Sequence, residues 1–513
     1  MAWLAIPDFS LGLNRDALPE ETPLGTTTNA RNMRFRNGFA ERANGMQTVY
    51  TTPTFAPYHI CHYTVGTTRF IVYTGLQKTA VDDGTTRTDI TLANNTGAID
   101  DRWCGFVFNG VYIQNNGVDV PQFWGGNPAV KLANLTGWPA GYKAGFMRAF
   151  GSYIIAGDIT RGGIREPDTI LWSSATEPGA IPSTWNIADA TKDAGDIPIA
   201  DTNGNLIDCM PLGDMNVIYK DDSLHYQQVI QNNFVFRFGR LPGATGLLAR
   251  GCVQNYPGGH VYLTPGFDLM THSGQGASSI LEGRMQRWLA STINASRATR
   301  SFLVASPATN EILVCFPSGS SLTCDMALVW NYKDNTFGVR DLVSVTYGST
   351  GQVALSDPTA TWSAAVGLTW ATMSRTWGFS DYASNSPRVI LSRTTPALAI
   401  YDAGTTDFGA AFPSSMEATG IHFGAKGQVK FVRGVRPVFD APDGTVIQVQ
   451  VGSSMSARAS PTYGPAVNFN VGWDVEVYPS TTGRFLAIKF STASGVSWRI
   501  RSCEIDVVQM GTF

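Results

Sequence analysis

Charged side chains are scarce in this 513-residue chain. Asp, Glu, Lys and Arg make up 15% of it, whereas about 25% is typical of soluble domains. The 37 Lys and Arg against 40 Asp and Glu leave a net charge of -3. This charge balance argues against a protein that binds nucleic acid tightly through a basic face. It still allows one that lets nucleic acid pass, because phosphate contacts cause retention. We expect much of this weakly charged surface to be buried in an assembly.

Paired cysteine motifs and long apolar runs are missing as well. The seven Cys are odd in number and none has the C-x-x-C spacing, so we expect reduced thiols packed as small hydrophobic groups. The start, Met1 to Asp8, lacks the basic region and the long apolar core of a signal peptide. No stretch approaches the apolar length of a membrane span. The expectation is a protein that is made and kept soluble, without export by itself and without a membrane span.

Signatures of catalysis and of cofactor binding are absent too. The sequence contains no G-x-x-x-x-G-K-S/T, no H-E-x-x-H and no G-x-S-x-G. The one cluster of ligand-type residues is His59 to His62, but on a strand His59 and Cys61 share a face and His62 points away, so a metal site is awkward. Gly274-Gln-Gly276 is better explained as a turn than as a dinucleotide loop. We predict no catalytic residue, no cofactor and no metal, and hence no enzyme.

An enzyme alternative is nevertheless open. Ser356 to Trp362 and Ser173 to Trp185 loosely resemble the Asp-box of sialidase-type propellers, although neither keeps its spacing. A turn followed by a packing Trp explains both stretches equally well. A propeller that binds or hydrolyses glycans of the host surface therefore stays the alternative reading.

The chain is rich in short strands, and Phe302 to Leu342 is the clearest case. Four apolar runs are separated there by Pro307 to Asn310, by Pro317 to Ser321 and by Lys333 to Asn335. Apolar runs bounded by such residues indicate an antiparallel meander with the size of one propeller blade. Both faces of the second strand are apolar, so we expect neighbouring sheets to cover both.

This pattern recurs and divides the chain into three parts. Residues 51–345 read as a β-propeller of about six blades, with a long insertion at 157–205 that we expect to form a tip loop. A capping box at Ser279 predicts a helix that continues to Ile293 and packs on a blade. Residues 346–513 read as a second, β-sandwich-like domain for docking, although 371–411 is not assigned. The protein is therefore predicted to be all-β.

Residues 1–50 form an N-terminal arm that we expect to pack on the C-terminal or a neighbouring domain. Asn37-Gly38 predicts a hairpin. The arm carries the most basic patch of the sequence, which consists of Arg31, Arg34, Arg36 and Arg42. These side chains could belong to a solvated or salt-bridged edge strand. Alternatively, the arm docks on another subunit or on an adaptor, or it contacts phosphates.

Several short motifs, taken in order, resemble the tail nozzle proteins of short-tailed bacteriophages, a group also called packaged-DNA stabilisation or tail tubular protein B. The motifs are Gly12-Leu-Asn14, Leu18-Pro19, Asn29 to Arg36, Gly38, Glu41-Arg42, Gly45, Leu171 to Ser174 with Glu177-Pro178 and Trp185, Ala327 to Tyr332, and Gly483 to Leu486. Together they span nearly the whole chain.

The resemblance implies a structural virion protein with no catalytic signature. It implies a homohexameric ring below the head-to-tail adaptor that holds packaged double-stranded DNA in and conducts it at ejection, without sequence specificity. It also implies docking of tail fibres or tailspikes, assembly in the host cytoplasm and a place in the virion tail.

Overall fold

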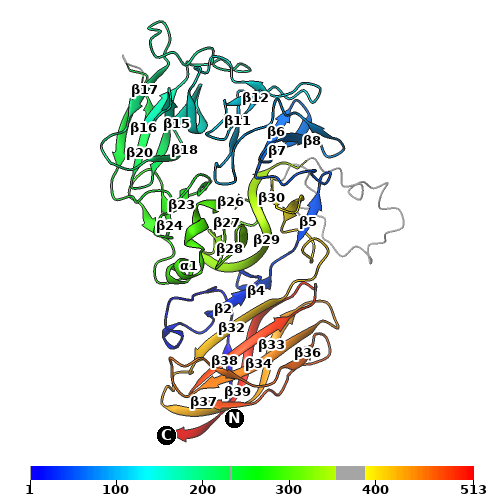
Figure 1. Cartoon of the computed structure of the whole chain (residues 1–513). Helices are drawn as coiled ribbons and strands as arrows, with labels where there is room; N and C mark the ends of the chain where they lie inside the picture. Colours follow the sequence, from blue (N-terminus) through cyan, green and yellow to red (C-terminus); the bar gives the residue numbers. More distant parts are fainter. Residues whose placement is uncertain (1, 231–233, 354–386, 513) are drawn as a thin grey trace.

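The protein is built almost entirely of antiparallel strands, as the sequence predicts. The computed structural model describes residues 2–230, 234–353 and 387–512. Figure 1 shows two parts: a ring of small sheets above, and a compact domain of orange and red strands below, with the blue N-terminal strands between them. No described helix is long and apolar enough to cross a membrane.

Five separate four-stranded sheets make up most of the ring. Each is a meander of consecutive strands, which turn residues such as Asn109-Gly110 and Gly151 connect. Their bounds are β6 (His59–Val65), β7 (Thr68–Thr74), β8 (Thr79–Asp82) and β9 (Arg87–Asp89); β10 (Cys104–Phe108), β11 (Val111–Asn115), β12 (Gln122–Trp124) and β13 (Ala133–Asn134); β14 (Lys143–Phe150), β15 (Tyr153–Arg161), β16 (Ile164–Trp172) and β17 (Gly195–Pro198); β18 (Leu206–Leu212), β19 (Met215–Lys220), β20 (Leu224–Val229) and β21 (Phe236–Leu241); β22 (Val253–Tyr256), β23 (Gly259–Leu263), β24 (Leu269–His272) and β25 (Ser278–Ser279).

The meander predicted at Phe302 to Leu342 forms the next sheet. Its strands are β26 (Phe302–Ser306), β27 (Glu311–Phe316), β28 (Cys324–Asn331) and the long β29 (Thr336–Gly351). Every residue of β27 is buried. The prediction of a strand covered on both faces is confirmed.

A further sheet combines strands from distant parts of the chain. The second half of β29 pairs with β30 (Arg388–Arg393), which pairs with β31 (Leu398–Tyr401), and β31 pairs with β5 (Met46–Val49) from the N-terminal segment. With the five separate sheets and the β26–β29 meander, it gives the described ring seven four-stranded units, of which the last two are joined in one sheet through the long β29. The expected count of about six omitted it, because β5 precedes residue 51 and two of its other strands follow residue 345.

Apolar clusters between neighbouring sheets hold the ring together. One cluster joins Phe302 and Leu313 to Leu391 of the composite sheet, and the next joins Ile390 to Ile71 of the β6–β9 sheet. The composite sheet therefore packs between the sixth and the first meander and closes the ring, which is the arrangement of a β-propeller. Because β5 comes from the N-terminal segment, closure depends on residues far apart in the sequence.

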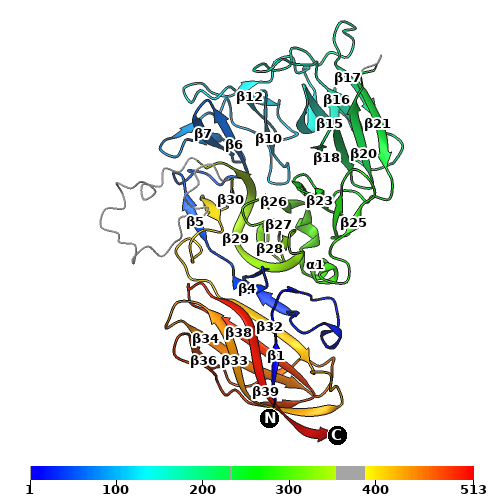
Figure 2. The same ribbon diagram turned by 180° about the vertical axis from the view of Figure 1, so that it is seen from behind.

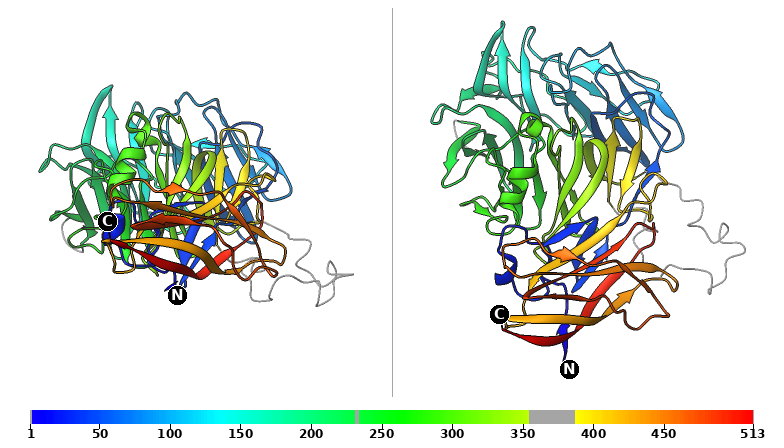
Figure 3. Two further views of the ribbon diagram at one scale, coloured as in Figure 1. Left: turned by 90° about the horizontal axis from the view of Figure 1, so that it is seen from below. Right: turned by 60° about the horizontal axis from the view of Figure 1, so that its bottom comes forward.

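The lower domain consists of two antiparallel sheets that face each other. Phe439 of one sheet contacts Phe490 of the other with ring centroids 5.4 Å apart. Figure 3 shows this domain from its far end, where both termini lie. One sheet contains β1 (Ala2–Ile6), β33 (Gln428–Asp440), β37 (Thr481–Gly483) and β39 (Arg499–Thr512), and the other contains β2 (Asn29–Arg31), β32 (Ser414–Ile421), β34 (Val446–Ser454), β35 (Thr462–Tyr463), β36 (Val467–Asn470) and β38 (Phe485–Thr492).

The N-terminal segment runs through both parts of the molecule. Its strand β1 pairs with β39, as Figure 2 shows, and β2 pairs with β32. The hairpin of β3 (Met33–Arg36) and β4 (Phe39–Arg42) then bridges β29 of the ring and β39 of the lower domain. Asn37 and Gly38 have φ angles of 52° and 80°, as a two-residue hairpin turn requires. The hairpin prediction is confirmed.

The helix prediction needs correction. The sequence pattern placed a helix from Ser279 to Ile293, but α1 spans only Gln286–Thr292. Ser279 lies on β25, and its hydroxyl accepts a hydrogen bond from the Glu282 N–H at 3.1 Å without starting a helix. Gly283, with a φ of +69°, interrupts the helical path. Two short 3-10 helices, η1 (Pro19–Glu21) and η2 (Ala295–Arg300), complete the described helical structure.

The expected insertion at 157–205 is partly regular structure. Strands β16 and β17 are the third and fourth strands of their sheet and lie inside this range. Pro167, Asp168 and the polar edge strand gave this stretch the composition of a loop. The irregular parts of this range are residues 173–194 and 199–205, besides the turn between β15 and β16.

Candidate functional site

The arginines predicted as an interface lie at the joint between the ring and the lower domain. Arg34 is 4% exposed. Its guanidinium pairs with Asp402, lies 3.7 Å from the carboxylate of Glu311 and 3.5 Å from that of Glu41. Glu311 belongs to the ring and is itself buried; burial raises the pKa of its carboxyl group and Arg34 opposes that rise. Arg34 therefore stabilises an internal contact between three chain segments.

A second buried network surrounds Asn32 at the same joint. Its side-chain oxygen accepts hydrogen bonds from Arg340 Nη1 at 2.9 Å and from the Asp341 N–H at 2.8 Å. Its amide nitrogen donates to Asp341 at 2.8 Å and to the carbonyl of Pro413 at 2.7 Å. Asn32 has a φ of 56°, a left-handed conformation that Asn tolerates better than most residues. One side chain thus connects the arm, the ring and the lower domain.

Phe412 lies between two arginines in this network. The guanidinium carbons of Arg42 and Arg340 are 3.8 and 4.1 Å from its ring centroid. Arg340 also pairs with Asp407 at 2.5 Å, and Arg42 donates to the Thr405 carbonyl at 2.9 Å. These two cations are stabilised by the aromatic ring and by the hydrogen bonds. They are buried and offer no surface.

The two remaining predicted arginines are more exposed. The side chain of Arg31 is 59% exposed and pairs with Asp341 at 2.6 Å, and that of Arg36 is 30% exposed and pairs with Glu41 at 2.5 Å. The structure brings all four predicted arginines together at one joint, each with an acidic or carbonyl partner in its own chain. Contact with another subunit stays a prediction for Arg31 and Arg36.

The axis of the ring holds a buried ion pair that the sequence analysis missed. The first strands of successive sheets contact one another around the axis. Arg148 on β14 donates to both carboxylate oxygens of Asp208 on β18, at 2.9 and 2.7 Å. Asp208 is fully buried and also accepts hydrogen bonds from the N–H groups of Cys209 and Gly251. A bidentate pair with two further donors is a rigid structural element.

The link between the first and second sheets contacts segments that precede the fifth and sixth meanders. Asp100 pairs with Arg300 at 2.7 Å, and Arg102 Nη1 donates to the carbonyls of Thr299 and Ser301 at 2.7 and 3.3 Å. Arg250 in turn donates to the Arg102 carbonyl at 2.7 Å. Thr299, Arg300 and Ser301 precede the sixth meander and Arg250 precedes the fifth, so these bonds tie the link to other sheets of the ring.

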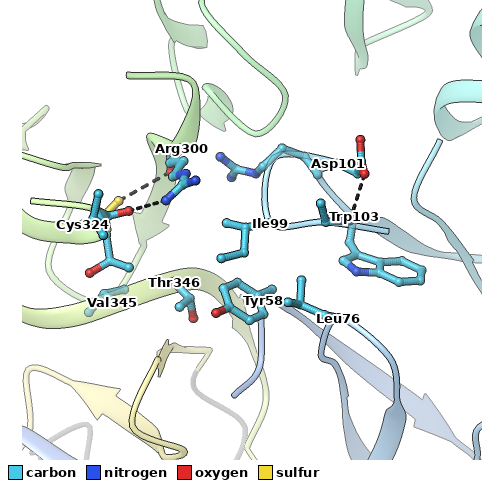
Figure 4. A pocket seen from close by; sticks show the side chains of 13 residues that line it. Tyr58, Leu76, Ile99, Asp101, Trp103, Arg300, Cys324, Val345 and Thr346 are labelled. Carbon is cyan, nitrogen blue, oxygen red and sulfur yellow. Dashed lines mark hydrogen bonds between the residues drawn. The ribbon is translucent and has the colours of Figure 1, made fainter. Parts of the chain in front are cut away.

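A small pocket, with a cavity volume of about 30 Å³, lies beside this link. Figure 4 shows Ile99 near its centre, between Arg300 on one side and Trp103 on the other, with Tyr58 and Thr346 below. Asp101 is the one carboxylate among its described lining residues. Retaining and inverting glycosidases commonly need two carboxylates. The pocket therefore lacks the acid pair of such a hydrolase.

In the ligand-type cluster at His59 to His62, His59 is buried and Cys61 and His62 are partly buried. Burial, assisted by Arg148 and Arg102, lowers the pKa of His59 to about 3. Burial raises the pKa of Cys61 to about 12. Among the residues that the structure describes, no group of three His, Cys, Asp or Glu side chains could hold a metal ion. Ser173 to Trp185 forms a loop in which Trp185 packs on Trp138, and Ser356 to Trp362 lies outside the described residues.

One surface feature stands out on the lower domain. The loop between β36 and β37 exposes Trp473, Val475 and Tyr478, which we call the aromatic strip; their exposed fractions are 75%, 74% and 68%. Beside it Glu476 pairs with Arg436 at 2.7 Å. Large apolar side chains exposed to this extent often mark an interaction site. The sequence analysis did not predict this strip, because a loop of this composition could equally be buried.

Comparison with known proteins assigns the chain to no family. No family model matches the chain, and no curated protein is similar in sequence. Among solved structures, it is similar to PorZ of Porphyromonas gingivalis, a bacterial surface component of the type-IX secretion system, at 8% identity over 70% of this chain and 38% of PorZ, with a TM-score of 0.36. It is also similar to YCF48 from Cyanidioschyzon merolae, at 9% identity over 70% of this chain and 98% of YCF48, with a TM-score of 0.37. These likenesses assign no function to the chain.

Proposed function

We propose that this protein is a non-catalytic subunit of a phage tail nozzle, in which the ring and the two-sheet domain, taken as a β-sandwich-like docking domain, form part of a channel wall. The resemblance of the sequence motifs to tail nozzle proteins gives the proposal its direction. The pocket with its single carboxylate is compatible with a protein that performs no chemistry. The proposal therefore depends on which surfaces of the subunit contact other subunits.

The observation that carries the proposal is the aromatic strip. Within one copy of the chain, Trp473, Val475 and Tyr478 remain largely exposed to water. Burying such side chains against a partner is favourable by about 25 cal/mol per Å² of apolar surface. An obligate assembly gives one reason to keep them on the surface. The low overall charge is compatible with burial of this surface between subunits, because the cores of protein interfaces are depleted of charged residues.

In this proposal the subunits form a closed cyclic ring, a hexamer as the resemblance implies, below the head-to-tail adaptor in the virion tail. Double-stranded DNA passes through the ring of subunits, not through the axis of one propeller, beside which Arg148 and Asp208 form a buried ion pair. A wall with few cations loses little free energy when DNA slides past, because each phosphate contact adds to retention. Tail fibres or tailspikes dock on the outside.

Measuring the mass of the purified protein tests this proposal. Mass photometry of the wild type should give closed oligomers. Trp473→Ser combined with Tyr478→Ser should shift the population to single copies. Ile164→Ser is the matched control, because Ile164 is 71% exposed on the opposite part of the molecule and should leave the oligomer intact. A wild type that stays single, or a strip variant that assembles normally, would refute the role of the strip.

A glycan-binding propeller is the second candidate, and the same strip supports it. Exposed Trp and Tyr rings present flat apolar faces beside the polar Glu476, a combination that suits recognition of a sugar. Titration of surface glycans of the host into single copies of the protein separates the candidates. Saturable binding that Trp473→Ser abolishes, in a protein that never assembles, would favour this second function.

A further inference from the structure

We propose that the aromatic strip of one copy docks into a groove on the lower domain of a second copy of this chain, beside the short helix η1. This contact rests on the proposed function, in which the subunits close into a ring. A ring of identical subunits needs two different surfaces on each copy, which meet head to tail. The strip is one of these surfaces, and the groove is the other.

The groove consists of two neighbouring hollows with cavity volumes of about 280 and 370 Å³. Pro19 of η1 and the pair Thr419 and Gly420 of β32 line both hollows and therefore lie between them. Leu24 lines the first hollow and Leu18 the second, and these side chains are 43% and 41% exposed. Concave surfaces with exposed apolar side chains suit the apolar side chains of a partner.

The ridge between the hollows is held in place by close contacts. Gly420 has a φ of +72°, and a Cβ built on it would lie 2.5 Å from the carbonyl carbon of Pro19. The arm therefore lies directly on β32. His422 Nε2 donates a hydrogen bond to the carbonyl oxygen of Glu20 at 3.1 Å. Because the groove is already formed in a single copy, docking costs little free energy of ordering.

The strip is held in place as well. The Tyr478 hydroxyl donates to the carboxylate of Glu476, which pairs with Arg436 at 2.7 Å. Asp474 accepts hydrogen bonds from the backbone N–H and the side-chain amide of Asn470, at 2.6 and 2.8 Å. The exposed rings therefore stand on a fixed loop, which again lowers the cost of docking.

The strip and the groove lie on different sheets of the lower domain. The strip borders β33, where Val477 pairs with Val435, whereas the groove lies over β32 and the start of β38. Within one copy, Trp473 of the strip remains 75% exposed, so the groove of each copy is open to the strip of another.

The two surfaces match in the number and size of their parts. The strip presents the rings of Trp473 and Tyr478 on either side of Val475, and the groove presents two hollows on either side of a ridge. Each aromatic side chain buries about 150–250 Å², and a standard interface buries about 800 Å² on each partner. The two rings thus form the centre of the contact, where most of the binding free energy is concentrated.

The charges of the two surfaces are complementary at the second hollow. The strip loop, from Trp473 to Tyr478, contains Asp474 and Glu476 and no basic residue. Arg458 lines the second hollow and is exposed. An acidic residue of the strip can therefore lie near Arg458 across the contact. Such pairs at the rim of an interface fix the orientation of the partners more than their affinity.

Leu18→Asp combined with Leu24→Asp, the groove variant, tests the contact by sedimentation velocity at a series of concentrations. It places charges where apolar rings should dock, on side chains exposed enough to leave the fold intact. The concentration at which half of the chains are assembled should rise by about tenfold or more. Leu92→Asp is the matched control, because Leu92 is 43% exposed on the ring, and it should assemble like the wild type.

Mixing two variants shows which surfaces meet. The strip variant, Trp473→Ser with Tyr478→Ser, keeps an intact groove, and the groove variant keeps an intact strip. At a concentration at which the wild type assembles, each should stay single alone, whereas the mixture should give pairs of chains and nothing larger. A groove variant that assembles like the wild type, or a mixture without pairs, would overturn this contact. A wild type that never assembles would instead overturn the proposed function together with the contact.

Cross-linking decides the matter if the groove variant fails to fold. Ala457 lines the second hollow. Ala457→Cys combined with Val475→Cys should let a short bifunctional thiol reagent link chains into a ladder, whereas either substitution alone, or the wild type, should give no linked chains. Links formed by Val475→Cys alone, or an assembled double variant without links, would overturn the contact.

Discussion

Replacing Arg340 with Met tests the claim that buried charge locks the ring to the lower domain. The change removes hydrogen bonds to Asn32 and to the Asn44 carbonyl, the pair with Asp407 and one face of the stack on Phe412. Asp407 is 7% exposed and would be left without its main cation. Breaking a buried pair in this way costs about 3–5 kcal/mol, a large share of the roughly 5–15 kcal/mol that stabilises a typical protein.

The matched control is Arg31→Met at the same joint. Arg31 also pairs with an aspartate, but its side chain is 59% exposed, and exposed pairs contribute about 0–1 kcal/mol. Scanning calorimetry compares the variants. Arg340→Met should lower the melting temperature strongly and split one transition into two, because the two parts then unfold separately. Arg31→Met should do neither.

A double variant separates charge from packing. Arg340→Met with Asp407→Leu removes the stranded carboxylate, and replacement of a buried pair by apolar groups is often close to neutral. The double variant should therefore regain much of the lost stability. The reasoning is refuted if Arg340→Met is no more damaging than Arg31→Met, or if the double variant is as unstable as the single one.

The remaining predictions concern pH, one buried cluster and one close backbone contact. Acidification from pH 6.5 toward 4 should lower the melting temperature, because burial depresses the folded pKa of four histidines and only the unfolded chain takes up protons in this range. Each such proton lowers the free energy of unfolding by about 1.4 kcal/mol per pH unit. An unchanged melting temperature between pH 7 and 5 would contradict this. The folded pKa values are about 3 for His59 and about 4 for His62, His260 and His272. Tyr219→Phe should cost about 1–3 kcal/mol in chemical denaturation, because the Tyr219 hydroxyl contacts His260 Nδ1 at 2.7 Å and His272 Nε2 at 2.8 Å; a neutral effect would mean that water replaces it. Gly338→Ala should raise protease sensitivity at the joint, since its Cβ would lie 2.4 Å from the Met33 carbonyl oxygen, and unaltered digestion would count against a tight β3–β29 contact.

Local signals in the sequence predicted the local structure well. The runs between Phe302 and Leu342 are strands because turn residues bound them and both faces are apolar, and the Asn37-Gly38 turn formed the expected hairpin. Where the pattern was ambiguous, the prediction was wrong. The helical spacing from Ser279 ignored Gly283, and the polar composition of 157–205 hid the last two strands of a sheet, β16 and the edge strand β17.

Features that depend on distant residues could not be predicted. The composite sheet needs β5 beside β31, some 350 residues later, and no local pattern records that pairing. The arginines of the arm were recognised as a basic patch, but their acidic partners Glu311, Asp341 and Asp402 come from other segments. The axial group of Arg102, Arg148 and Arg250 likewise appears only when the meanders close around the axis.

The most direct test of a wall-forming subunit is electron microscopy of the purified, full-length protein in negative stain. The account predicts closed rings of subunits around a central hole wide enough for double-stranded DNA, with the aromatic strip at contacts between subunits. Single particles of one chain each, at every concentration tried, would contradict it.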